Sequence, residues 1–253
     1  MLKQRIIFTL LYDNGYYIQS RNFRRQKIGN AKWINKNYNF SYISNFIDEL
    51  IILDVSKKKN KKKFINDSKL ITDNVFVPIA LGGGVYSFDQ ARYYFENGAD
   101  KTIINSIVIN DSTIINKIAN NYGSSSVIIS IDVRFKMNNY FVYINNGLKN
   151  TNLTLEEYLK KISNLDFAEI YLNSIDRDGT GTGIDKGLIK IINKFNYKYI
   201  ITGGLGNYKH FIEGFKSTNK VKAIATANLL NFLGDSLKIV KANLLKNNIN
   251  LVS

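Results

Sequence analysis

The chain alternates between short apolar runs and longer segments in which apolar residues recur at helical spacing. The runs are rich in β-branched side chains and apolar almost throughout, which is typical of parallel strands buried on both faces. We predict strands at residues 6–11, 49–54, 78–81, 102–105, 127–132, 169–173, 199–202 and 223–226. We predict helices at residues 88–97, 112–121, 154–163, 186–195, 208–216 and 229–247.

Eight strand–helix units in 253 residues are typical of a (β/α)8 TIM barrel, an α/β fold. An additional hairpin is predicted around residues 140–144, closed near Asn146 and Gly147. No break in composition divides the chain, so we expect one domain over residues 1–253.

An internal repeat supports the barrel. Sliding the chain by 120 residues places the strand that begins at Glu49 on the strand that begins at Glu169, and the residues 83–84 on 203–204. Two half-barrels of four units each would produce this pattern, whereas a doubly wound sheet would not.

Composition excludes several classes of protein. The chain has no Cys and one His, so we expect neither disulfides nor a metal centre, and no cofactor. Its apolar runs are too short to span a membrane, and the first 30 residues lack the features of a secretory signal. We therefore expect a cytoplasmic protein that does not bind membranes.

The net charge of +15 would suit an anionic partner. The densest basic cluster covers residues 57–63, and it is either a solvated loop or an electrostatic lure for an anionic substrate. No aromatic residues interleave with it as a nucleic-acid platform would require, so we expect no nucleic acid partner.

Glycines and small polar residues follow the predicted strands at repeat-related positions, where the chemistry of a barrel collects. Such glycines are either tight turns or cradles whose backbone N–H groups approach an anion. Because both halves keep the set, we favour two phosphate cradles and a small ligand with a phosphate at each end. The candidate residues are Gly83, Gly84, Asn105, Ser106, Gly203, Gly204, Thr226 and Asn228.

Acid–base chemistry between two such cradles needs two titratable groups. Asp132 ends the fifth strand, but its repeat partner at the end of the first strand is Leu11, which cannot carry a proton. Asp54 ends the second strand, and a polar Gly-rich loop at residues 174–183 contributes Asp178 and Gly179. Further strand-end candidates are Asn173 and Thr202.

These residues resemble the cyclase subunit of imidazole glycerol phosphate synthase over essentially the whole chain. The likeness rests on the Gly82-Gly83-Gly84 and Gly203-Gly204 turns, the Asp48-Glu49-Leu50 strand start, and above all the Ser-Ile-Asp-Arg-Asp-Gly-Thr string at residues 174–180. The resemblance implies a barrel that receives ammonia from a glutaminase partner and adds it to a doubly phosphorylated substrate.

The chain departs from the family at positions that take part in catalysis or substrate binding. The family pairs two acids at the ends of strands one and five, and here the first position is Leu11 and the second Asp132. A substrate-contacting lysine is replaced by Gln19, and a threonine by Asn173.

The family's ammonia gate, at the opposite mouth of the barrel, is retained in residue type. Its matching positions are Arg5, Glu49, Lys101 and Glu169. Buried charges cost free energy unless paired, so a ring of alternating sign is informative. The same four residues could instead be a purely stabilising ion-pair network.

Three hypotheses follow. The segment at residues 10–15 resembles a branch associated with glycan amidation, which implies that the barrel conducts ammonia from a glutaminase docked at its N-terminal face. The ammonia would convert an acetamido sugar to its acetamidino form, and the resemblance implies a sugar-modifying amidotransferase as a further partner. The alternative is a working cyclase of histidine biosynthesis, in which Asp54 or Asp178 covers for Leu11. A barrel without ammonia traffic is the third.

Overall fold

The computed structural model describes residues 3–228 and 236–252, and within them eight parallel strands close into a barrel. Each strand pairs in parallel with both neighbours in the ring, and the pairings of β12 with β1 and of β7 with β10 complete the closure. The predicted (β/α)8 fold is confirmed. In ring order the strands are β1 (Arg5–Asp13), β4 (Glu49–Asp54), β5 (Ile79–Gly82), β6 (Lys101–Ile104), β7 (Val127–Lys136), β10 (Glu169–Ser174), β11 (Tyr199–Thr202) and β12 (Val221–Thr226).

Alternate residues of these strands face the barrel lumen and the helices. Inward residues form a small buried cluster that includes Ile7, Ile51 and Tyr171, while outward residues such as Phe8 and Leu50 join the large core beneath the helices. The strands are buried on both sides, which explains why they read as almost continuous apolar runs.

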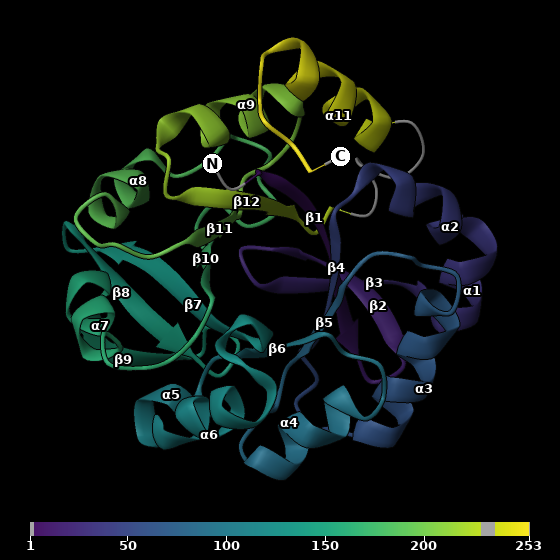
Figure 1. Ribbon diagram of the computed structural model, residues 1–253, viewed down its shortest axis with the longest axis horizontal. Helices are drawn as coiled ribbons and strands as arrows, with labels where there is room; N and C mark the ends of the chain where they lie inside the picture. The colour runs from purple at the N-terminus through teal and green to yellow at the C-terminus, as the bar shows by residue number, and fades with distance from the viewer. Residues whose placement is uncertain (1–2, 229–235, 253) are drawn as a thin grey trace.

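Helices surround the ring of strands, as Figure 1 shows looking down the barrel. They are α1 (Ala31–Asn37), α2 (Phe40–Ile43), α3 (Lys61–Thr72), α4 (Phe88–Phe95), α5 (Ile107–Asn110), α6 (Thr113–Tyr122), α7 (Leu155–Lys161), α8 (Lys186–Ile192), α9 (Tyr208–Ser217) and α11 (Ser236–Lys246). The first five predicted helices are present, and each of their ends lies within three residues of the predicted one. Of the sixth, the part at residues 229–235 lies outside the described residues.

Helix α3 was not predicted, because its first turn lies in the lysine-rich cluster. Asn60 caps it through the backbone N–H of Lys63, and its apolar face buries Phe64, Ile65 and Ile71. The interpretation of residues 57–63 as a loop is therefore correct only for residues 57–60.

Two hairpins extend strands β1 and β7 beyond the barrel. The predicted one is formed by β8 (Asn139–Ile144) and β9 (Lys149–Thr154), with Asn146 and Gly147 in its turn as expected. The hairpin of β2 (Tyr16–Arg21) and β3 (Arg24–Asn30) was not predicted, because charged residues mask its alternation. Its tip is fixed to the Gly-rich loop by a backbone hydrogen bond from Asn22 to Asp178.

The half-barrel repeat is visible in the backbone. Gly83 and Gly203 have φ of +94° and +92°, and Gly84 and Gly204 have φ of +77° and +87°. These left-handed conformations favour glycine. Among the described residues, no helix is long and apolar enough to cross a membrane.

Candidate active site

Four charged side chains meet inside the N-terminal mouth of the barrel. Each is the first residue of its strand, namely Arg5 of β1, Glu49 of β4, Lys101 of β6 and Glu169 of β10. The Glu49 Oε2 atom lies 2.9 Å from both the Arg5 guanidinium and the Lys101 ammonium, and Arg5 also pairs with Glu169. The structure thus joins all four predicted gate residues in one network of alternating charge, which we call the charged ring.

The charged ring is largely removed from solvent, with Glu49 only 1% exposed. Burial alone would lower the pKa of Arg5, but the hydrogen bond and charge of Glu169 and the charge of Glu49 raise it overall. Each charge of the ring is therefore compensated by a neighbour of opposite sign.

A cavity of about 500 Å³ opens at the other, C-terminal end of the barrel. It collects side chains from the ends of most strands, as the position of barrel chemistry predicts. The sequence-predicted residues that line it are Leu11, Asp54, Gly83, Gly84, Asn105, Ser106, Asp132, Asn173, Asp178 and Thr202.

Among the acids of this cavity, Asp132 has the pKa that is shifted most. Its two carboxylate oxygens accept hydrogen bonds from the side-chain amides of Asn105, at 2.8 Å, and Asn173, at 3.3 Å. Burial raises the pKa of Asp132 to about 6, although both amides act in the opposite direction. A carboxyl group with that pKa can take up or release a proton close to neutrality. Asn105, proposed as a phosphate ligand from sequence, is thus engaged with this acid.

Leu11 lines the same cavity and supplies no proton-transfer group. Of the two acids that could replace it, Asp178 is the one whose charge contributes to the raised pKa of Asp132. Asp178 accepts hydrogen bonds from the Ser20 hydroxyl, at 2.5 Å, and the Phe23 backbone N–H, at 3.0 Å. Burial raises the pKa of Asp178, while these two hydrogen bonds lower it.

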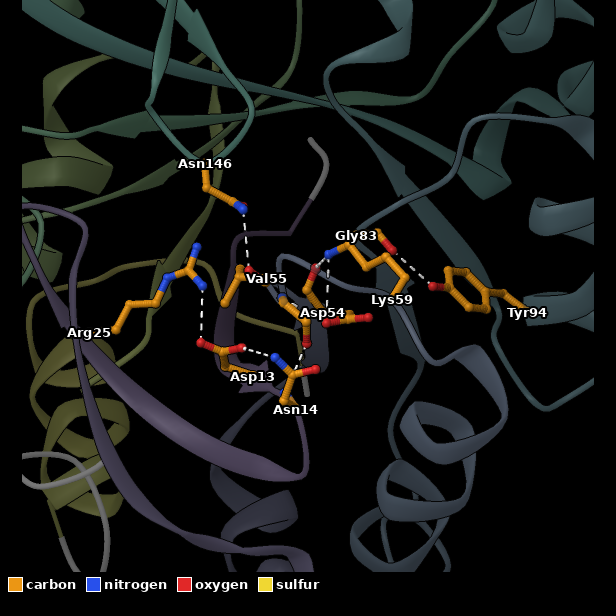
Figure 2. A network of polar contacts seen from close by, with 10 residues as sticks. Asp13, Asn14, Arg25, Asp54, Val55, Lys59, Gly83, Tyr94 and Asn146 are labelled. Atoms are coloured by element: carbon orange, nitrogen blue, oxygen red, sulfur yellow. Dashed lines mark hydrogen bonds and ion pairs between the residues drawn. The ribbon is translucent and has the colours of Figure 1, made fainter.

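The Asp54 carboxylate forms an ion pair with a lysine (Figure 2). The Lys59 ammonium lies 3.6 Å from the Asp54 carboxylate and donates to its backbone carbonyl. Burial lowers the pKa of Lys59 and raises that of Asp54, and their mutual attraction opposes both changes. This lysine belongs to the basic cluster, so one member of the cluster does enter the cavity wall.

The first pair of glycines packs against these two residues. A Cβ at Gly83 would lie 2.0 Å from the Asp54 carbonyl oxygen, and one at Gly84 would lie 3.0 Å from the Lys59 side chain. Glycine is therefore required at position 83 by the close approach of the Asp54 backbone and favoured at position 84 by its left-handed φ of +77°, with the Lys59 side chain packed beside it.

Sequence reasoning missed a second basic residue in the cavity wall. Arg25 of strand β3 lines the cavity and pairs with Asp13 at 3.0 Å (Figure 2). The only available signal was the Asn22 turn between two alternating segments, which would have placed the hairpin but not its contact with the barrel. With Lys57 and Lys59, Arg25 makes this side of the cavity basic.

The candidates of the second half-barrel meet in a smaller neighbouring cavity. A Cβ at Gly204 would lie 2.1 Å from the Gly183 carbonyl oxygen, so glycine is required there too. The Gln19 amide donates to Asn228 at 3.2 Å. Predicted residues lining this cavity are Asp178, Gly179, Thr202, Gly203, Gly204, Thr226 and Asn228.

Fold and site together define a (β/α)8 barrel with a charged ring at one mouth and an acid-bearing, partly basic cavity at the other. Residues 5–233 match the model of the histidine biosynthesis protein family, and the chain belongs to that family.

The relatives agree. The chain is 44% identical over 243 residues to "Putative imidazole glycerol phosphate synthase subunit hisF2" of Parasynechococcus marenigrum (strain WH8102), covering 94% of this chain and 89% of that protein. It is 34% identical over 254 residues to "Imidazole glycerol phosphate synthase subunit HisF" of Hydrogenobaculum sp. (strain Y04AAS1), covering 99% of both. A protein of the same name from Chlorobium limicola (strain DSM 245 / NBRC 103803 / 6330) is 33% identical over 95% of both chains.

Proposed function

We propose that this chain is the synthase subunit of a glutamine amidotransferase of the imidazole glycerol phosphate synthase type. A glutaminase docks at the N-terminal mouth, ammonia enters through the charged ring, and a phosphorylated substrate receives it in the C-terminal cavity. The observation that carries the proposal is the placement of the ring and Asp132 at opposite ends of one barrel lumen.

The ring offers ammonia a point of entry. Glu49 Oε1 is buried and accepts no hydrogen bond from the described residues, while Oε2 is held by Arg5 and Lys101. A buried acceptor without a donor is costly, so an N–H donor that reaches it gains a hydrogen bond. Ammonia is a small donor of that kind.

The reaction favoured by the comparisons is the cyclase reaction of histidine biosynthesis, which was the alternative from sequence. The relatives are described as subunits of imidazole glycerol phosphate synthase, and two of them align over nearly their full length. In this proposal Asp132 and Asp178 share proton transfer, and the two cradles and the basic wall of Arg25 and Lys59 hold the phosphates.

A second candidate function remains glycan amidation, and the observation that favours it is Leu11 in the cavity wall. Loss of one of two proton-transfer groups typically costs about 10²–10⁴ in rate. A barrel that only delivers ammonia to a sugar-modifying enzyme would not need the lost acid.

Turnover of the doubly phosphorylated cyclase substrate with saturating ammonium, and no partner, tests the proposal. We expect imidazole product from the unchanged protein and a loss of at least 100-fold in Asp132→Asn. Asp166→Asn, an exposed substitution at the other end of the barrel, is the control and should retain full activity. A folded protein that forms no product would overturn the cyclase reaction and favour the second candidate.

A further inference from the structure

Tyr171 lies in the lumen between the charged ring and the cavity. On strand β10 the inward residues are Glu169 in the ring, Tyr171, and then Asn173 in the cavity wall. At about 3.3 Å per residue, Tyr171 stands about 7 Å beyond Glu169 along the strand. It is 4% exposed and belongs to the cluster that fills the lumen.

The Tyr171 side chain reaches across the barrel. Its hydroxyl lies 3.2 Å from the Thr9 hydroxyl of β1, and either atom can be the donor. Strands β10 and β1 are separated by β11 and β12 in a ring of eight, so this hydrogen bond spans the lumen. Thr202 of β11, the strand beside β10, lines the cavity beyond this pair. We call the paired hydroxyls of Thr9 and Tyr171 the hydroxyl bridge.

The neighbours of the hydroxyl bridge are apolar. The inward residues packed with Tyr171 include Ile7, Ile51, Ile128 and Ile200. A polar molecule that crosses a purely aliphatic layer loses its hydrogen bonds, at a cost of about 1–3 kcal/mol or more for each group. Tyrosine and threonine hydroxyls both donate and accept, so they can exchange partners with a small molecule that does the same.

We propose that the hydroxyl bridge is a relay on the ammonia route, through which ammonia leaving the charged ring passes to Asp132. Ammonia displaces Thr9 from the Tyr171 hydroxyl, takes both hydrogen bonds, and continues into the cavity as the hydroxyl pair re-forms. This inference rests on the proposed function, because it needs ammonia to enter at the ring.

Binding of ammonia to the bridge is tested without any turnover. The protein is labelled with tyrosine carrying ¹³C at Cζ, and the Tyr171 resonance is assigned with Tyr171→Phe. Ammonium chloride is then added at a pH where much of it is free ammonia. We expect a saturable shift of this resonance, and an apparent affinity at least threefold weaker in Thr9→Val. No shift, an equal shift with tetramethylammonium chloride, or an unchanged affinity in Thr9→Val would overturn the proposal.

Passage is tested by comparing two sources of ammonia in the complex with the glutaminase. Added ammonium reaches Asp132 through the open cavity and bypasses the bridge, whereas ammonia from glutamine must cross it. In Thr9→Val we expect glutamine-driven product formation to fall at least threefold, with ammonium-driven formation within twofold of the unchanged protein.

The matched control is Thr102→Val. Thr102 is fully buried on the outward side of β6, away from the lumen, and should leave both rates unchanged. Equal losses from both ammonia sources in Thr9→Val, or no loss at all, would overturn the relay. Absence of product in the unchanged protein would instead contradict the cyclase reaction, and the ammonia titration would still decide the relay.

Discussion

The side-chain amide of Asn105 lies 2.8 Å from the Asp132 carboxylate, and the second carboxylate oxygen is held by the Asn173 amide. No cation among the described residues forms an ion pair with this acid, which is buried where β7 leaves the barrel and continues into the hairpin with β8. Neutral amides orient a carboxylate without cancelling its desolvation cost. The cavity therefore holds a carboxyl group of fixed orientation, and burial raises its pKa to about 6.

Because of this environment, ionisation of Asp132 lowers the free energy of unfolding. Its pKa is raised from 3.8 to about 6 by burial, so its favourable contribution is fully present below the unfolded pKa and is lost as the pH rises through 6. Between pH 4 and pH 8 we expect the free energy of unfolding of Asp132→Asn to rise, relative to the unchanged protein, by about 2–3 kcal/mol. Urea unfolding at both pH values measures this, and parallel pH profiles for the two proteins would contradict the assignment.

Restoring an acid at Leu11 tests what its loss means. In Leu11→Asp we expect at least tenfold faster ammonium-driven cyclase turnover, because the cavity regains a second proton-transfer group opposite Asp132. A carboxylate at this half-buried position should also lower stability by about 1–3 kcal/mol.

Leu53→Asp is the matched control for that substitution. Leu53 is the β4 partner of Leu11 in strand register and also lines the cavity. It carries the same burial cost but should not raise turnover. If both variants are equally slow, Leu11 does not limit the chemistry.

Breaking the charged ring should separate glutamine hydrolysis from ammonia delivery. In Lys101→Ala, Glu49 keeps its pair with Arg5, so we expect the barrel to remain folded with a loss of about 1–2 kcal/mol. Product formed per glutamine hydrolysed should fall several-fold, while ammonium-driven turnover is unchanged. Lys198→Ala, an exposed lysine near the start of β11, should behave as the unchanged protein. Equal delivery by the Lys101 variant would argue for a purely stabilising network.

Lys59 should contribute to binding of a phosphorylated ligand. We expect Lys59→Gln to weaken binding of the doubly phosphorylated substrate about tenfold and to reduce its salt dependence, because a half-buried ammonium is lost from the cavity wall. Lys58→Gln removes an exposed neighbour that does not line the cavity and should change the Kd less than twofold. Calorimetric titration at two salt concentrations distinguishes them, and equal effects would mean that the cluster acts only at long range.

Much of the fold and of the composition of the cavity can be predicted from the sequence. The apolar runs predicted eight buried strands, and the 120-residue repeat predicted the paired glycine turns that adopt left-handed backbone in both halves. Because parallel strands of a barrel end at the same face, the residues at their ends predicted the composition of the cavity. The same reasoning could not find α3 or the β2–β3 hairpin, where charged residues mask the periodicity.

Other relationships arise only from closure of the barrel. The alternation of side chains along a strand indicates that Tyr171 and Thr9 face the lumen. Their hydrogen bond, however, joins two strands that are distant in sequence and three places apart in the ring. Likewise, the placement of Arg25 and Lys59 in the cavity wall depends on how a hairpin and a loop pack over the strand ends. The sequence by itself determined the fold, the faces of the strands and the types of charge at each mouth. Only the tertiary structure decided which groups meet, because contact across a lumen is set by the ring geometry and not by spacing along the chain.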